Sequence, residues 1–247
     1  MTELKDGERI EDLQYKGLRI IQNERGFRFG TDSVLLAGFV TGGPHDKMID
    51  LGAGTGVISI LVEGRIGAKL TALEIQPEQC DMARRSIAMN GQQITVVEGD
   101  MRIAHETLGS GAFDAAVCNP PYFPASGGRI SKKGEAGYEG AATHELFCTV
   151  AEVAAAAGRL LKYGGKLFMC CPVSRLAEVI AALTSERLEP KRMRLVASRA
   201  DKAPYLALIE AKKGANPGLK MEKLLVICRE DGSYTEEANR IYLRKND

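Results

Sequence analysis

A glycine-rich turn at residues 50–56, Asp-Leu-Gly-Ala-Gly-Thr-Gly, is a first feature of the sequence that could bind a ligand. It follows an apolar run from Lys47 that is typical of a strand. Gly52, Gly54 and Gly56 allow a tight turn and let a ligand approach closer than a Cβ would permit. The spacing differs from the dinucleotide-binding Gly-x-Gly-x-x-Gly pattern, which disfavours a bound pyrophosphate.

Acidic residues close the first three predicted strands and indicate what that ligand could be. Asp50 opens the glycine turn, Glu74 lies near the end of the run from Lys69, and Asp100 ends the run from Ile94. An acid at the place of Glu74 can bind two ribose hydroxyls, and Asp100 is placed to accept a hydrogen bond from an adenine amine. Each acid alone is typical of a solvated strand end, but the three together beside a glycine turn indicate a nucleoside-binding edge.

The stretch FDAAVCNPPYF, residues 113–123, carries the second group of candidate functional residues. Its apolar part predicts a buried strand. Two consecutive prolines cannot donate to a strand ladder, and the first holds Asn119 out of the helical region. We therefore expect a stiff extended corner at Asn119, Pro120, Pro121 and Tyr122; the alternative is a turn that only ends the strand.

The elements that position these residues are predicted to form a sheet. From residue 47 onward, short apolar runs alternate with helical stretches. This alternation predicts parallel strands joined by crossover helices. We expect one strand to enter the glycine turn, others at residues 69–75, 94–100, 113–119 and 166–172, and closing strands within 191–198, 204–213 and 223–230. Turns rather than helices join the closing strands, which favours an antiparallel edge.

The helices and segment boundaries follow from capping residues and composition. Thr143 with Glu145 is expected to cap a long alanine-rich helix that runs to Gly164-Gly165. Residues 1–45 form an N-terminal arm with a helix that begins near Thr31 or Asp32, and residues 46–247 form the main domain, the two together making one structural unit. The glycine-rich segment 124–142 is long for a loop in a compact domain, which favours a functional or disordered loop.

Composition sets further limits on the function. The chain has 247 residues, 45% hydrophobic and 26% charged, with a formal net charge of +1, so a nucleic-acid contact would need a local basic patch. Its six cysteines include no Cys-x-x-Cys pair and its three histidines are far apart, so we expect neither a metal site nor a disulfide framework. We see no signal peptide and no run that could span a bilayer, and we expect a cytoplasmic protein.

The turn at 50–56, Glu74, Asp100 and the Asn-Pro-Pro-Tyr corner together resemble the Rossmann-like S-adenosylmethionine-dependent methyltransferases that act on exocyclic or amide nitrogens. The resemblance implies a mostly parallel seven-stranded α/β sheet with an antiparallel edge and helices on both faces. It implies S-adenosylmethionine as cofactor, bound by the residues Thr31, Asp50, Gly52, Gly54, Gly56, Glu74, Asp100 and Asn119. It also implies that the Asn119 amide oxygen and the Pro120 carbonyl accept the two hydrogens of a target amine, while Tyr122 stacks on the target.

Two outer segments narrow the resemblance to one family. GFRFGTDSVLLAGFV at residues 26–40 and the region 212–237 resemble the family that methylates the exocyclic N6 amine of an adenine beside the anticodon of tRNA1(Val). This implies a tRNA substrate, with the arm segment at Phe29 to Asp32 lying over the cofactor, and we expect a monomer. A basic run at 187–202, with Arg129, Lys132 and Lys133, could form a positive surface near the corner, although such a run is also typical of a solvated face.

Two other functions are compatible with the same residues. Release-factor glutamine methyltransferases also carry Asn-Pro-Pro-Tyr, but they have a helical N-terminal domain larger than the arm of this chain. A protein that only binds S-adenosylmethionine is the other alternative, and it would have no use for Asn119.

Overall fold

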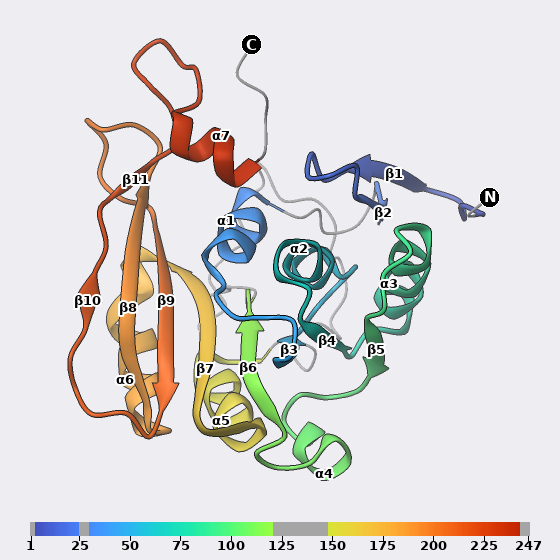
Figure 1. Cartoon of the computed structure of the whole chain (residues 1–247), viewed down its shortest axis with the longest axis horizontal. Coiled ribbons are helices and arrows are strands. Elements are labelled where there is room, and N and C mark those ends of the chain that lie inside the picture. The colour runs from blue at the N-terminus through green and yellow to red at the C-terminus, as the bar shows by residue number, and fades with distance from the viewer. Residues whose placement is uncertain (1–2, 25–29, 121–147, 243–247) are drawn as a thin grey trace, which may run out of the picture.

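A mixed sheet forms the centre of the protein in the computed structural model, which describes residues 3–24, 30–120 and 148–242 (Figure 1). Its seven longer strands lie in the order β8-β9-β7-β6-β3-β4-β5. The strands of the parallel part are β3 (Lys47–Leu51), β4 (Lys69–Glu74), β5 (Thr95–Glu98), β6 (Phe113–Cys118) and β7 (Leu161–Pro172). β9 (Leu206–Lys213) runs antiparallel to both β7 and β8 (Leu188–Ala197), so the predicted antiparallel edge is confirmed.

Two short strands extend the sheet beyond these seven longer ones within the described residues. β10 (Lys220–Met221) and β11 (Leu225–Val226) each pair in parallel with β8, which gives nine strands in all. Within the expected closing strand at 223–230, only Leu225 and Val226 form a strand. Cys228 makes an isolated bridge to Tyr234 instead, so the last segment folds back on itself.

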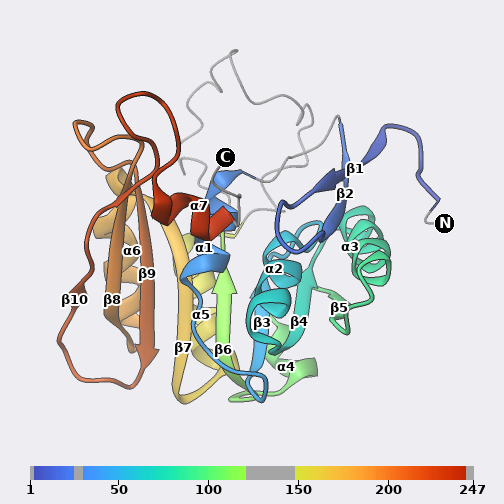
Figure 2. The ribbon, with the colours of Figure 1, turned by 45° about the horizontal axis from the view of Figure 1, so that its top comes forward.

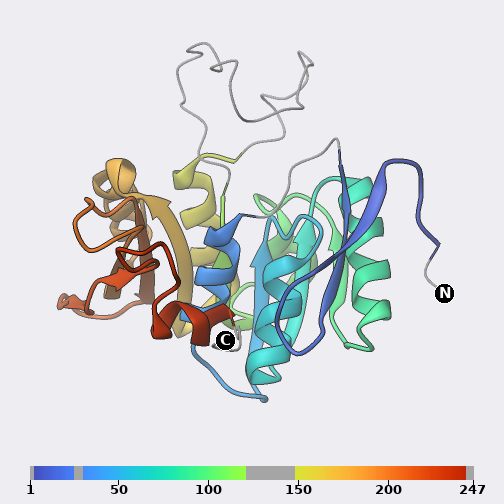
Figure 3. The same cartoon turned by 90° about the horizontal axis from the view of Figure 1, so that it is seen from above.

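Helices cover both faces of the sheet, as predicted. α1 (Thr31–Phe39), α2 (Val57–Ile66) and α3 (Pro77–Met89) pack on one face, where α7 (Glu236–Tyr242) joins them. α4 (Ala104–Leu108), α5 (Val150–Leu160) and α6 (Leu176–Ser185) enclose a second apolar core on the other face. Figure 3 shows α1 and α2 on the opposite side of the sheet from α5 and α6.

The boundaries of α5 correct the sequence prediction. Thr143 and Glu145 lie outside the described residues, and the helix begins at Val150, where Thr149 and Glu152 form a capping box. The helix ends at Leu160, and β7 follows immediately, so Gly164 and Gly165 lie inside a strand and do not terminate the helix. An alanine-rich run continues a helix readily but does not mark where it ends, which explains the error.

The N-terminal arm contains a β-hairpin that the sequence analysis did not predict. β1 (Glu8–Asp12) and β2 (Arg19–Asn23) form a separate antiparallel sheet beside α3 (Figure 2). The Arg85 guanidinium of α3 donates to Glu8, and the Ile21 amide donates to the Ser86 hydroxyl over 2.9 Å. The hairpin is therefore held along α3, while α1, which also belongs to the arm, packs in the core against α2.

Candidate active site at the carboxyl end of the parallel strands

The predicted functional residues lie at the carboxyl edge of the sheet, where the strand order reverses. The chain passes from β3 outward through β4 and β5, and then returns to β6 on the other side of β3. β3 and β6 pair in parallel, with Asp50 opposite Val117, so the glycine turn and Asn119 leave neighbouring strands at the same edge. In open parallel sheets this reversal point is where ligands bind.

The glycine turn is held in a conformation that favours glycine. Gly52, Gly54 and Gly56 have φ angles of 74°, 56° and 88°, in the left-handed region. The Gly52 and Ala53 amides donate to the Leu73 carbonyl, which folds the turn over the end of β4. The turn therefore lies beside the end of β4, where the next acidic residue is found.

Glu74 is buried, with 6% of its surface exposed, and its carboxylate faces the glycine turn. One oxygen accepts from the Gly54 amide over 2.9 Å, and the other accepts from the Gln76 amide over 3.0 Å. The Gln76 side-chain amide also lies 3.4 Å from the second oxygen, whereas the oxygen that accepts from Gly54 keeps a lone pair for a ligand hydroxyl. Among the described residues, no atom lies within 4 Å of the place of a Cβ on Gly54, so the turn faces open space. The geometry fits a ligand with neighbouring hydroxyls, such as the ribose of S-adenosylmethionine.

Asp100 lies two residues after β5 and forms an ion pair with Arg102. The Arg102 Nε donates to the Asp100 carboxylate over 2.8 Å, and the Arg102 backbone amide donates to it over 2.9 Å. These bonds hold the pKa of Asp100 below its ordinary value, although partial burial opposes them. Asp100 is therefore an ionised hydrogen-bond acceptor at the end of the third strand, as a contact with an adenine amine would require.

Asp50 is almost completely buried, and its described contacts are with α2. Its Oδ2 accepts from the Ser59 amide over 3.1 Å and from the Ser59 hydroxyl over 2.7 Å. Its Oδ1 is buried without a hydrogen-bond partner among the described residues. Burial raises the pKa of Asp50 to about 7, and the nearby Glu74 carboxylate adds to the increase. Asp50 thus fixes α2 under the glycine turn, and its predicted cofactor contact stays a prediction.

As the pH rises from 5 to 7, we expect the free energy of unfolding of Asp50→Asn to fall less than that of the wild type. The folded protein holds the Asp50 proton up to about pH 7, whereas the unfolded chain releases it near pH 3.8. The bound proton therefore stabilises the folded state fully below about pH 4, and this stabilisation is lost by about pH 7. The neutral asparagine can keep both bonds from Ser59. Urea unfolding at pH 5 and pH 7 should show that the wild type loses about 2 kcal/mol more than the variant; parallel pH profiles would contradict this.

The Asn119 side chain is held by contacts at both ends of its amide. Its Nδ2 donates to the Ser33 hydroxyl of α1 over 3.1 Å, and its Oδ1 accepts from the Cys170 thiol of β7 over 3.0 Å. Pro120 is buried directly after it. Pro121 and Tyr122, the other members of the predicted corner, lie outside the described residues. The described part of the corner is therefore a half-buried, oriented amide at the end of β6.

The first turn of α1 lies beside the corner. α1 begins at Thr31, as predicted, and Ser33 contacts Asn119 two residues later. The Thr31 hydroxyl lies 3.4 Å from an Asp32 oxygen, and partial burial raises the pKa of Asp32. Phe29 lies outside the described residues. Thr31 and Asp32 therefore reach the predicted edge, and their contact with cofactor or target stays a prediction.

Three residues near Asn119 and Asp32 were not identified from the sequence. Ser33 and Cys170 contact Asn119, and Tyr205, at 41% exposure, lies close to Asp32, whose charge adds to burial in raising the pKa of the tyrosine. For Cys170 the missing information was the strand register: Cys118 pairs with Met169, which places the next residues of the two strands side by side. For Ser33 it was the packing of α1 against the sheet.

The basic run at 187–202 does not form one positive surface. Arg187 and Lys191 lie at the start of β8, at the opposite edge from Asn119, so the prediction is wrong for them. Arg194 pairs with Glu237 over 2.7 Å. Only Arg199 and Lys202, among the described basic residues of the run, follow β8 at the edge of the candidate site.

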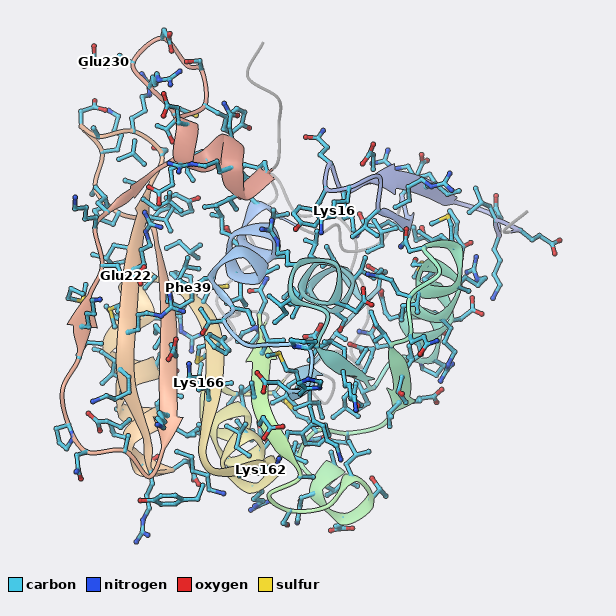
Figure 4. All side chains as sticks on the ribbon, in the orientation of Figure 1. Lys16, Phe39, Lys162, Lys166, Glu222 and Glu230 are labelled. Atoms are coloured by element: carbon cyan, nitrogen blue, oxygen red, sulfur yellow. The ribbon has the colours of Figure 1, made fainter. Side chains whose placement is uncertain are left out.

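Arg192 also belongs to a structural network instead of a free surface. It donates to Glu210 over 2.8 Å and to Glu222 over 3.1 Å, and its guanidinium lies 3.8 Å from the centre of the Phe39 ring. Figure 4 labels Glu222, Phe39 and Lys166 at this antiparallel part of the sheet. Arg192 therefore joins α1 to the antiparallel edge of the sheet.

Another hollow among the described residues lies away from the candidate site. A hollow of about 540 Å³ lies at the amino end of the strands, lined by the residues Lys47, Lys69, Leu70, Thr71, Gln93, Ile94, Thr95 and Phe113, at the edge opposite Asn119. In the described part of the chain, no group of three or more His, Cys, Asp or Glu side chains could hold a metal ion. No described helix has the length and apolar character needed to cross a membrane.

A Rossmann-like sheet with these groups at its reversal point is characteristic of enzymes that use a nucleoside cofactor. Residues 27–177 match the Methyltransferase small domain family, and the chain belongs to that family. It is an S-adenosylmethionine-dependent methyltransferase. The predicted class, fold and cofactor are therefore confirmed, while the cofactor contacts of individual residues remain predictions.

Related proteins of known sequence and structure agree with this class. Relatives named tRNA1(Val) (adenine(37)-N6)-methyltransferase include one from Bacteroides fragilis, 27% identical over 80% of this chain and 82% of the relative. One from Tolumonas auensis is 25% identical over 93% of this chain and 96% of the relative. A crystal structure from Agrobacterium tumefaciens, described as a predicted O-methyltransferase, has a TM-score of 0.70 and 23% identity over 86% of this chain and 95% of that one. At that identity the structure shows the fold alone.

Proposed function

We propose that the protein transfers a methyl group from S-adenosylmethionine to the N6 amine of an adenine in tRNA, with the adenine in the anticodon loop. The observation that carries the proposal is the oriented amide of Asn119 at the end of β6, on the sheet of a methyltransferase. The names of the relatives from Bacteroides fragilis and Tolumonas auensis support the substrate. A tRNA substrate also supports the predicted cytoplasmic location, and we expect the monomer to be active.

The cofactor would be held by the three strand ends. Glu74 would bind the ribose hydroxyls through its carboxylate, with the Gln76 side chain giving way at one oxygen, and Asp100 would accept from the adenine amine of the cofactor. The backbone of the turn from Gly52 to Gly56 would lie against the rest of the cofactor, and Asn119 and Thr31 would complete the contacts. When bound, S-adenosylmethionine supplies a methyl group on a positively charged sulfur, which an amine nitrogen can attack.

Asn119 would supply the main polar contact with the target. An adenine amine is a poor nucleophile because its lone pair is delocalised into the ring. An acceptor that binds an amine hydrogen draws the nitrogen toward tetrahedral geometry and stabilises the positive charge that develops on it. The Asn119 Oδ1 would accept one hydrogen and the Pro120 carbonyl the other. Tyr122, in the same corner, is proposed to stack on the base.

An unpaired base suits this site. An anticodon-loop adenine can be turned out and stacked at lower cost than a base in a duplex. Tyr205 offers a partly exposed ring close to Asp32, and Arg199 and Lys202 lie at the same edge of the sheet, where they could bind phosphate groups. These residues would let a chain with an ordinary net charge of +1 bind RNA locally.

The substrate class is tested with three acceptors under the same conditions. Purified protein is incubated with labelled S-adenosylmethionine and total tRNA from a strain that lacks the gene, with double-stranded DNA, or with a release factor. We expect label in tRNA, and the incorporation should fall strongly with salt because phosphate contacts are ionic. Label only in the release factor would replace the adenine with a glutamine amide. Cofactor binding without label in any acceptor would count against the proposal.

A further inference from the structure

We propose that Ser33 and Cys170 are positioning residues, which hold the Asn119 amide with its oxygen in place to accept from the target amine. This inference rests on the proposed function for its catalytic consequence, and on the described contacts for its geometry. Nδ2 of Asn119 donates to the Ser33 hydroxyl over 3.1 Å, and the Cys170 thiol donates to Oδ1 over 3.0 Å. The amide is thus held from α1 on one side and from β7 on the other.

The orientation of this amide matters because its two ends are nearly equal in shape and opposite in hydrogen bonding. A rotation of the amide by half a turn would present an NH₂ group where the target amine needs an acceptor. The Ser33 hydroxyl cannot prevent the rotation by itself, since a hydroxyl both donates and accepts. A second contact, on the amide oxygen, therefore helps to hold the orientation that the structure shows.

Cys170 provides the second contact, to the amide oxygen. A thiol donates and accepts only weakly, so Cys170 contributes to the orientation of the amide together with Ser33 and does not fix it alone. Cys170 is completely buried, and burial raises the pKa of its thiol well above the ordinary value, so the thiol keeps its proton and stays a donor. Since Oδ1 has two lone pairs, the bond from Cys170 leaves one for the target amine.

The neighbouring Cys171 offers a matched control. Cys170 belongs to the apolar core on the α1 face of the sheet, whereas Cys171, also completely buried, belongs to the core on the opposite face. Replacing either cysteine by alanine removes a buried sulfur from the same strand. Only the Cys170 variant removes the donor to Asn119. Comparing the two variants therefore distinguishes the effect of losing this hydrogen bond from the effect of losing a buried sulfur.

The catalytic test compares Cys170→Ala, Ser33→Ala and Cys171→Ala. We expect kcat for tRNA methylation to fall roughly five- to tenfold in each of the first two, the value of one neutral hydrogen bond. KM for tRNA and Kd for S-adenosylhomocysteine should stay close to the wild-type values. Cys170→Ser should recover part of the loss, because its hydroxyl still donates. Equal falls of kcat in Cys170→Ala and Cys171→Ala would overturn the positioning role.

A spectroscopic test does not depend on activity. The two side-chain NH signals of Asn119 are identified in a ¹⁵N–¹H NMR spectrum by their loss in Asn119→Ala. We expect both Ser33→Ala and Cys170→Ala to shift these signals, and Cys171→Ala to leave them unchanged. If the wild type methylates no acceptor, the proposed function fails, and this comparison alone decides whether the amide is held. Signals that do not respond to either Ser33→Ala or Cys170→Ala would refute the inference.

Discussion

Asn119→Ala is expected to lower kcat by about 10²- to 10³-fold, the loss found when one preorganised polar group is removed from an enzyme site. The alanine removes the oxygen that would accept from the target amine, and it leaves the partners Ser33 and Cys170 in place. The Kd for S-adenosylmethionine should rise by no more than about tenfold, the value of the one neutral hydrogen bond that Asn119 could make to the cofactor. Single-turnover methylation and calorimetric titration measure the two quantities separately.

The control for this variant is Asn90→Ala. Asn90 is the C-cap residue of α3 and exchanges hydrogen bonds with the backbone of Arg19, so its loss should lower stability without a direct effect on turnover. Comparing kcat at a temperature where both variants are folded separates chemistry from folding. Turnover of Asn119→Ala within a factor of about three of the wild type would rule out the proposed role of the amide, since removal of a preorganised polar group should cost about 10²-fold or more.

Glu74→Ala is expected to weaken cofactor binding and to leave turnover nearly unchanged, the opposite of what we expect for Asn119→Ala. The alanine removes the carboxylate proposed to bind the ribose, and each hydrogen bond to a charged group contributes about 1.5–3 kcal/mol. We therefore expect the Kd for S-adenosylmethionine to rise at least about tenfold, while kcat at saturating cofactor stays near the wild-type value. The unfolding free energy should also fall by about 1–3 kcal/mol, because the Gly54 and Gln76 amides lose their acceptor.

Glu98→Ala is the matched control for Glu74. Glu98 pairs in register with Glu74 on the adjacent strand β5, but it is exposed at the surface. The same change one strand away should leave the Kd for the cofactor unchanged. An equal increase of Kd in both variants would point to a general effect of negative charge at this edge of the sheet and would contradict a ribose contact by Glu74.

The sequence was informative where a local rule determines the structure. The parallel strands from Lys47 to Cys118 follow from apolar runs between turns, and α3 begins at Pro77 and is capped at Asn90, residue types that favour a helix start and a helix end. The first turn of α1 at Thr31 was predicted in the same way. These elements place the glycine turn, Glu74 and Asn119 at one edge, so the position of the candidate site followed from sequence.

The contacts around the site depend on tertiary packing, and sequence patterns do not determine them. Cys170 reaches Asn119 only because β6 and β7 pair in one register, and Ser33 reaches it only because α1 crosses that edge. Arg192 belongs to a basic run that is compatible with RNA binding, but it is paired with Glu210 and Glu222, 18 and 30 residues away in the chain. Register, helix packing and long-range ion pairs were therefore the missing information.

The central claim is that the methyl group is transferred to the N6 amine of adenine at the site of Asn119. Its most direct test is mass spectrometry of the nucleosides from tRNA after reaction with S-adenosylmethionine, with authentic N6-methyladenosine, 1-methyladenosine and 2-methyladenosine as standards. We predict N6-methyladenosine from the wild type and none above background from Asn119→Ala. A methyl group on a ring nitrogen, a ring carbon or a ribose, or N6-methyladenosine formed equally by both proteins, would contradict the account.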